Sequence, residues 1–498
     1  MSSPARRRFA WLMVAGFALI VVAASRRSAR QQPAFPSLPA DSPLGAGVVA
    51  PCVAAGPGSS RCGVFRVIEQ RESATGRSGR TIDIAFVILD ATEPAQRTRD
   101  AVMLLPGGPG EPLTPIAAGA AGRLRDVRRT RDILLVDVRG VGRSSGLSCT
   151  VPYPGGLASR FGTLFPLDHA AACRDSLARR ARLDAYTTAS SVDDLEDLRR
   201  WLGYDALNLM GGSYGTRVAQ VFMRRHPRTV RTVVLNGVGP VAEPLYVQHA
   251  FLLQRALDRL LDECQADSAC HAAYPRLREQ LAQLLERFRG GPVEVDVRGT
   301  RVAFGAGDLA YALRGLLYGR GAELPRLLHA AADGAIAPLA NYYLQRTDWV
   351  GSAGDYAGYH FSVLCAEDIA PLTDADVARQ TRGTFMGAHL IDGYRAVCRL
   401  WPYARLPASH WTPVVSDVPT LLLSGGRDPV TPPEGAAAVA AHLTRKLHVV
   451  VPNGGHGVWN ACIQRMVTHL ITTASLAGVD TSCVAAVPPT RFATPTGS

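Results

Sequence analysis

The hydrophobic positions of this chain change their period along the sequence. Several short runs rich in Val, Ile and Leu are bounded by Gly and Pro, which is the pattern of strands buried on both faces of a parallel sheet. Between them lie stretches whose apolar residues recur every three to four positions, as in amphipathic helices. Strands alternating with helices predict an α/β fold, with a mostly parallel central sheet and helices on both faces.

Glycine, proline and polar clusters mark the ends of the predicted strands. These strands cover residues 62–70, 81–91, 101–105, 133–136, 206–210, 229–235, 420–423 and 447–451. The clearest helix is predicted over residues 190–202. Ser190 or Ser191 can cap its N-terminus, and Leu195 and Leu198 lie on one apolar face.

The alternation stops between residues 240 and 412. Helical patterns such as 251–264 and 277–288 dominate there, which predicts a mostly helical cap inserted between two strands of the core. The predicted division is a core formed by residues 52–239 and 413–483, a cap over 240–412 and a disordered tail over 484–498.

The N-terminus has the pattern of an export signal. Three arginines precede an apolar run from Phe9 to Ala24, and small residues and two more arginines follow. The run is shorter than the roughly 20 residues that span a bilayer, whereas the arginines after it leave an uncleaved anchor open. We predict that residues 1–29 are an export signal or N-terminal anchor and that residues 30–51 are a flexible spacer. The bulk of the chain is then periplasmic or secreted, and any membrane contact is through that anchor.

Ten cysteines agree with an oxidising compartment, because an even number in an exported chain predicts disulfides. The rival interpretation, a zinc site, needs close Cys-x-x-Cys or Cys/His spacing, which this sequence lacks. Sequence alone leaves the connectivity open. The most local pairing is Cys52–Cys62, Cys149–Cys173, Cys264–Cys270, Cys365–Cys398 and Cys462–Cys483.

Composition and charge exclude some classes of protein. With 47% hydrophobic residues among 498, the chain is neither wholly disordered nor collagen-like. The formal charge is +12, but beyond the N-terminus no dense basic run with interleaved aromatic residues occurs. We therefore expect no nucleic-acid partner.

A Gly-x-Ser-x-Gly motif provides the first candidate catalytic residue. Residues 211–215 are Gly-Gly-Ser-Tyr-Gly, and they follow a predicted buried strand and precede an amphipathic segment over residues 216–224. This order is typical of a nucleophile elbow, a tight turn that holds a serine hydroxyl at the carboxyl edge of the sheet. We predict Ser213 as the nucleophile. An ordinary turn that happens to contain a serine is the alternative.

A serine nucleophile needs a base and an orienting acid. His456 follows the last predicted strand, and His410, in a loop, is the second choice for the base. Asp417 precedes the strand over residues 420–423 and so lies at the wrong edge, whereas Asp428 follows it at the carboxyl edge. The order Ser213, Asp428, His456 is that of α/β-hydrolases.

Acyl transfer also needs preorganised donors for the oxyanion. The glycine-rich run 106–110 directly follows the predicted strand over residues 101–105. In that fold, the first loop that donates to the oxyanion lies at this position. We expect the backbone N–H of Gly108 (or Gly107) and that of Tyr214 to form this pair. A phosphate-binding loop is disfavoured, because the run lacks a Gly-Lys-Ser/Thr ending and Gly-x-Gly-x-x-Gly spacing.

Five motifs together resemble the proline iminopeptidase and tripeptidyl aminopeptidase family of α/β-hydrolases. They are Pro-Gly-Gly-Pro-Gly at 106–110, Asp-Val-Arg-Gly-Val-Gly-Arg-Ser at 137–144, Gly-Gly-Ser-Tyr-Gly-Thr at 211–216, Gly-Arg-Asp-Pro-Val-Thr-Pro at 426–432 and Gly-Gly-His-Gly at 454–457. The cysteines of the C-terminal part resemble the exported tripeptidyl aminopeptidase branch.

This resemblance implies an α/β-hydrolase fold and a serine exopeptidase that acts on the free N-termini of peptides through an acyl-enzyme, with no metal or cofactor. Two residues depart from cytosolic proline iminopeptidases, which usually have His at the position of Pro106 and Gln near Val138. The substrate rules of that subgroup are therefore not carried over.

An aminopeptidase must hold the ammonium group of its substrate, normally with carboxylates of the cap. The predicted cap offers Glu367, Asp368 and Glu243. Glu367 is the first choice, because a cysteine two residues before it would fix its position through a disulfide. The alternative is that these acids belong to a solvated loop.

Two other functions remain open at this point. A secreted carboxylesterase would use the same triad and oxyanion hole. A non-catalytic binding protein would have no need of all three triad residues. Epoxide and haloalkane hydrolases are disfavoured, because they need Asp at the position of Ser213. The sequence leaves open the length and identity of the released unit.

Overall fold

The computed structural model of the 498-residue chain describes residues 34–53, 59–71, 79–149, 155–347 and 356–495. The predicted export signal over residues 1–29 therefore lies outside the described residues. Within the described ranges, no helix has both the length and the apolar character needed to cross a membrane.

A nine-stranded sheet forms the centre of the molecule, in the order β1-β2-β3-β5-β4-β6-β7-β10-β11. The pairs β1/β2, β2/β3 and β3/β5 are antiparallel, and the strands from β5 to β11 run parallel. The bounds are β1 Gly47–Pro51, β2 Ser60–Ile68, β3 Thr81–Leu89, β4 Asp100–Leu105, β5 Ile133–Val136, β6 Ala206–Gly212, β7 Val230–Asn236, β10 Thr420–Gly425 and β11 Lys446–Val451. The predicted fold class is confirmed, and the eight predicted strands end within about two residues of the observed ones.

Helices cover both faces of this sheet because successive strand residues point in opposite directions. In β10, Leu422 belongs to one buried cluster, whereas Leu421 and Leu423 belong to a second cluster on the other face. The helices that follow core strands are α2 Ala117–Arg123, α3 Leu167–Ala178, α4 Thr188–Trp201, α5 Tyr214–Arg225, α15 Pro433–Ala440 and α16 Ala461–Thr473. The predicted helix over 190–202 is α4, but its N-cap is Thr187, whose side chain accepts from the Ser190 N–H.

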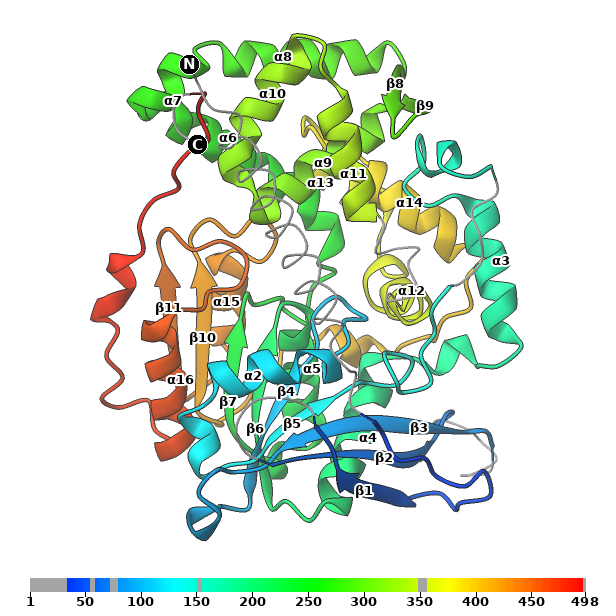
Figure 1. Cartoon of the computed structure of the whole chain (residues 1–498), viewed down its shortest axis with the longest axis vertical. Coiled ribbons are helices and arrows are strands. Elements are labelled where there is room, and N and C mark those ends of the chain that lie inside the picture. The colour runs from blue at the N-terminus through cyan, green and yellow to red at the C-terminus, as the bar shows by residue number, and fades with distance from the viewer. Residues whose placement is uncertain (1–33, 54–58, 72–78, 150–154, 348–355, 496–498) are drawn as a thin grey trace, which may run out of the picture.

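The segment between β7 and β10 forms a separate group of helices beyond the carboxyl edge of the sheet (Figure 1). Its helices are α6 His249–Ala266, α7 Ser268–Ala273, α8 Leu277–Arg289, α9 Ala306–Gly319, α10 Leu324–Ala332, α11 Ala337–Thr347, α12 Ala357–Leu364, α13 Asp374–Thr381 and α14 His389–Cys398. It also contains a hairpin of β8 Val293–Val297 and β9 Thr300–Phe304, which was not predicted.

Two segments are more ordered than the sequence predicts. Part of the expected spacer over 30–51 is the edge strand β1, because its backbone pairs with β2 from Gly47↔Phe65 to Pro51↔Arg61. The expected disordered tail over 484–498 is also wrong over its described part. Tyr274 donates to the Ala493 carbonyl at 2.9 Å, and the chain runs from α16 toward α7 (Figure 1).

All ten cysteines form disulfides, and the pairing between sequence neighbours is confirmed. The bridges are Cys52–Cys62, Cys149–Cys173, Cys264–Cys270, Cys365–Cys398 and Cys462–Cys483. Each of the five joins a strand or a helix to a neighbouring segment inside the core or inside the cap. Such bridges fit an oxidising compartment.

Reduction is expected to destabilise the protein, because each bridge restricts the unfolded chain and contributes about 2–4 kcal/mol to the free energy of unfolding. Thermal unfolding with and without a reductant measures this effect. Alkylation of the native protein should label no cysteine, and two or more labelled cysteines would contradict the pairing.

Candidate active site

Ser213 lies in the turn between β6 and α5, as predicted. Its φ of 53° and ψ of −124° place a non-glycine residue in a strained region of backbone space. A Cβ on Gly211 would lie 2.2 Å from the Gly215 carbonyl oxygen, and one on Gly215 would lie 2.6 Å from the Leu105 oxygen. The turn is therefore so tight that only glycine fits at both flanking positions.

Asp428 and His456 meet at the same edge of the sheet, because each follows the carboxyl end of a parallel strand. His456 Nδ1 lies 2.9 Å from Asp428 Oδ2 and 3.1 Å from Oδ1. Thr431 Oγ1 donates to Asp428 Oδ2 at 2.7 Å and lies 3.1 Å from His456 Nδ1. The carboxylate thus fixes the ring and directs Nε2 away from itself.

The environment of Asp428 keeps it ionised. Its side chain is fully buried beside His456. Burial alone would raise the pKa of Asp428, but the His456 hydrogen bond and charge and the N–H groups of Val430 and Thr431 outweigh it, so the pKa is lowered. A buried carboxylate held in this form stabilises a positive charge on the neighbouring imidazole.

One pocket of about 800 Å³ contains both Ser213 and His456, and we call it the Ser213 pocket. Its lining includes Gly107, Gly108, Glu111, Arg123, Ser213, Asn236, Tyr246, Arg314, Tyr318 and His456. Tyr246 and the α9 residues Arg314 and Tyr318 come from the segment between β7 and β10, which therefore covers Ser213.

The predicted oxyanion donors flank this pocket. Gly108 lines it with a φ of 101°, a conformation that favours glycine. Tyr214 is the first residue of α5, where a backbone N–H has no partner within the helix. The Tyr214 side chain points elsewhere and contacts Thr188 Oγ1 at 2.6 Å, so only its backbone can serve here.

Glu367 does not line the Ser213 pocket, contrary to the role expected for it. It lies in the π-helical turn Cys365–Ile369 and is completely buried. Its two carboxylate oxygens accept from the N–H and the Oγ1 of Thr188, both at 2.8 Å. Burial raises the pKa of Glu367 to about 7 against the opposing effects of Arg217 and Thr188. Its contacts join the cap to α4, so it is unavailable to a substrate amine.

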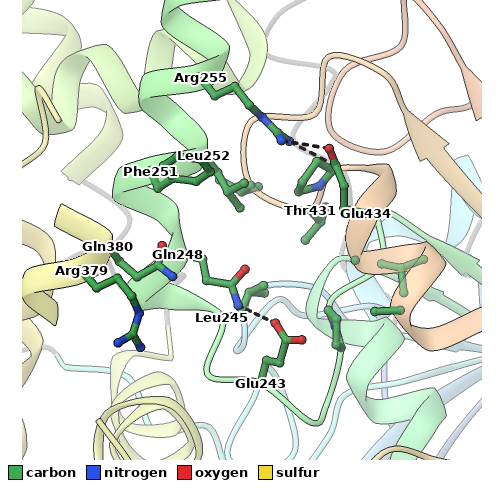
Figure 2. A pocket seen from close by; sticks show the side chains of 16 residues that line it. Glu243, Leu245, Gln248, Phe251, Leu252, Arg255, Arg379, Gln380, Thr431 and Glu434 are labelled. Carbon is green, nitrogen blue, oxygen red and sulfur yellow. Dashed lines mark hydrogen bonds and ion pairs between the residues drawn. The ribbon is translucent and has the colours of Figure 1, made fainter. Parts of the chain in front are cut away.

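The other two expected amine-binding acids are also engaged elsewhere. Asp368 accepts from Arg217 at 2.7 Å and from the Leu245 N–H at 2.6 Å, so its charge is already compensated. Glu243 is exposed and lines a different pocket of about 470 Å³, where Gln248 donates to it at 2.7 Å (Figure 2). The structure thus brings neither of them to Ser213 as a free carboxylate.

His410, the second choice for the base, is not among the residues that line the Ser213 pocket. It is buried, and its Nε2 lies 3.6 Å from Glu367 Oε2. Burial, with Arg217 and Arg224, lowers the pKa of His410 to about 4. Among the described residues, no group of three His, Cys, Asp or Glu side chains is placed to hold a metal ion.

Two protein-family models match parts of this sequence. Residues 100–285 match the model described as alpha/beta hydrolase fold, and residues 383–483 match the model described as TAP-like protein. The chain has the α/β-hydrolase fold. Its resemblance to the tripeptidyl aminopeptidase branch is confirmed by the second match.

The relatives of this hydrolase are distant but cover most of its length. Serine protease Hip1 of Mycobacterium tuberculosis is 26% identical, over 83% of this chain and 85% of the relative. The tripeptidyl aminopeptidase of Streptomyces coelicolor is 23% identical, over 81% and 80%. The putative hydrolase YuaR of Escherichia coli is 24% identical, over 82% and 85%. A proline iminopeptidase of Mycobacterium smegmatis is a similar solved structure, with a TM-score of 0.35, 14% identity and coverage of 80% and 96%.

The hydrolase is a serine hydrolase, as predicted. Sequence analysis nevertheless missed three groups at its site. Thr431 holds the Asp428–His456 pair, Glu111 is the one acidic residue lining the Ser213 pocket among the described residues, and Arg314 lines it from α9. Glu111 directly follows the glycine-rich run and could have been found there. Arg314 lies in an ordinary helical pattern, which carries no signal.

Proposed function

We propose that this hydrolase is an exported serine exopeptidase that releases residues or short units from the free N-terminus of peptides. The observation that carries the proposal is the elbow serine and the Asp428–His456 pair under a cap, with one acidic side chain in the same pocket. The names of the relatives, a tripeptidyl aminopeptidase and a serine protease, support peptide substrates. The five disulfides support export.

The reaction follows from the positions of these groups. His456 removes the proton of Ser213 Oγ as the oxygen attacks the scissile carbonyl, while Asp428 stabilises the imidazolium. The N–H groups of Gly108 and Tyr214 stabilise the oxyanion. The imidazolium then protonates the amine of the scissile bond. That amine is released, and the acyl group remains bound to Ser213 as an ester. Water, deprotonated by His456, hydrolyses the ester and regenerates Ser213.

Selection of a chain end follows from the cap. Tyr246, Arg314 and Tyr318 line the pocket from above the sheet, so a folded polypeptide cannot pass through, whereas the end of a short peptide can enter. A free amine is then chosen by a negative charge at a fixed distance from Ser213. Glu111 takes this role in place of Glu367, because its carboxylate is exposed and has no ion-pair or hydrogen-bond partner among the described residues.

Glu111→Gln tests this proposal. The substitution keeps the shape and removes the charge, so kcat/KM for free-amine tripeptidyl arylamides should fall about 10-fold, or about 1.4 kcal/mol, relative to kcat/KM for a small neutral ester. Glu243→Gln is the matched control, because it removes the same charge from another pocket.

A panel of substrates tests the exopeptidase proposal itself. It pairs aminoacyl, dipeptidyl and tripeptidyl arylamides with their N-blocked counterparts. A wild-type enzyme that cleaves simple esters far faster than any arylamide and ignores N-blocking would overturn the exopeptidase proposal in favour of the carboxylesterase alternative. A preference for free amines that Glu111→Gln leaves intact would remove only the role of Glu111.

A further inference from the structure

Arg314 is a buried cation in the Ser213 pocket, and it has no ion-pair partner among the described residues. Arg314 lies on α9 and is only 8% exposed, yet it lines the pocket that contains Ser213 and His456. Its guanidinium carbon is 5.2 Å from the centre of the Tyr311 ring and 4.8 Å from that of Tyr318. The side chain is therefore fixed between two aromatic rings.

Three titratable groups near Arg314, His249, His360 and Tyr246, are neutral at neutral pH. Its one hydrogen bond among the described residues is a long one, 3.5 Å to Tyr318 Oη, and its buried Nε has no partner. Burial lowers the pKa of the nearby His360 to about 4 and that of His249 well below its ordinary value. Burial likewise raises the pKa of Tyr246. In the part of the chain that the structure describes, no carboxylate lies within 4.0 Å of the Arg314 guanidinium nitrogens.

Other buried arginines of the same molecule show what such a charge requires. Arg139 and Arg217 are at most 2% exposed, and each lies 2.7 Å from a carboxylate, of Asp194 and Asp368 respectively. Removal of a guanidinium from water is costly unless a charged or hydrogen-bonding partner replaces the water. The aromatic faces offset only part of that cost for Arg314.

We propose that Arg314 binds a carboxylate of the substrate, so that this hydrolase prefers substrates with a negative charge near the scissile bond. The planar guanidinium suits the two oxygens of a carboxylate, and enclosure between two rings orients it toward the pocket. The inference rests on the proposed function only in placing the reaction at Ser213. Two sources supply this group, an acidic side chain and the free C-terminus of a short peptide.

Matched ester pairs test the charge without requiring a peptide. The probes are 4-nitrophenyl hemisuccinate and 4-nitrophenyl butyrate, which differ chiefly in a terminal carboxylate, and the readout is the ratio of their kcat/KM values. In the wild type this ratio should exceed that of Arg314→Met by about 10- to 100-fold. Arg123→Met is the matched control, because Arg123 lines the same pocket but is exposed, and it should keep the wild-type ratio.

Peptide substrates then show whether the carboxylate comes from an acidic side chain or from the free C-terminus. Cleavage of tripeptides with a free C-terminus is compared with that of their C-terminal amides, and Glu-containing arylamides are compared with Gln-containing ones. The preference that disappears in Arg314→Met identifies the source of the carboxylate.

Three outcomes would overturn the proposal. They are a wild type that treats charged and neutral esters alike, a loss of activity in Arg314→Met that is equal for both, and a ratio that depends on Arg123 instead. Should Arg314→Met fail to fold, two measurements still decide the test. They are the ratio of kcat/KM values in the wild type and the same ratio in Arg314→Lys, which retains the charge. If the free-amine preference is absent while the ester ratio still depends on Arg314, the exopeptidase proposal fails and the carboxylate site stands.

Discussion

Replacement of Ser213 by alanine is expected to abolish hydrolysis of every substrate, with kcat reduced by about 10⁴ or more. The reason is that Ser213 Oγ forms the covalent bond in the proposed reaction, whereas the hydroxyl of the adjacent Tyr214 points away to Thr188 Oγ1. Alanine keeps the Cβ and thus the same strained backbone, so the melting temperature should remain that of the wild type. Steady-state kinetics and thermal unfolding measure the two effects.

Covalent labelling provides the complementary measurement. A phosphonate that reacts with activated serines should modify the wild type at Ser213 alone and leave Ser213→Ala unmodified, as mass spectrometry of the digested protein would show. Modification of a different serine would show that the nucleophile has been misassigned.

Replacement of His456 by alanine is expected to reduce kcat to the same extent as the serine variant, because the triad acts as a unit and losses within it do not add. His456 is the histidine that lines the Ser213 pocket among the described residues, and its Nδ1 lies 2.9 Å from Asp428 Oδ2. The remaining nitrogen, Nε2, is therefore the one that can accept the serine proton.

His410→Ala is the matched control for that experiment. His410 is buried near Glu367 and not among the residues that line the Ser213 pocket, so its loss should affect stability more than kcat. If His410→Ala were inactive and His456→Ala active, His410 would be the base and His456 would not.

The core of the fold and the positions of Ser213, Asp428 and His456 at one edge of the sheet could be predicted, because both leave local marks in the sequence. A strand buried on both faces requires a continuous apolar run, and a turn with no room for a Cβ requires glycine, as at Gly211 and Gly215. Asp428 and Asp417 could then be separated by the edge of the sheet at which each must lie.

The partners of the expected amine-binding carboxylates could not be predicted in the same way. The sequence around an Asp or Glu residue does not show which group will form a hydrogen bond or ion pair with its carboxylate. Glu367 meets Thr188, which is 179 positions away, and that contact forms only when the cap packs on the core. The same holds for β1, an edge strand whose short run is stabilised by its pairing with β2 rather than by its own composition.

The position of the cap within the chain has a consequence for biosynthesis. A polypeptide made from its N-terminus presents Ser213 long before Asp428 and His456 exist, since the whole of α6 to α14 comes between them. An incomplete chain then has a nucleophile without a base, and it cannot acylate itself or cleave neighbouring nascent chains at a useful rate. Activity begins only when β10 and β11 join the sheet, so hydrolysis is delayed until synthesis is nearly complete.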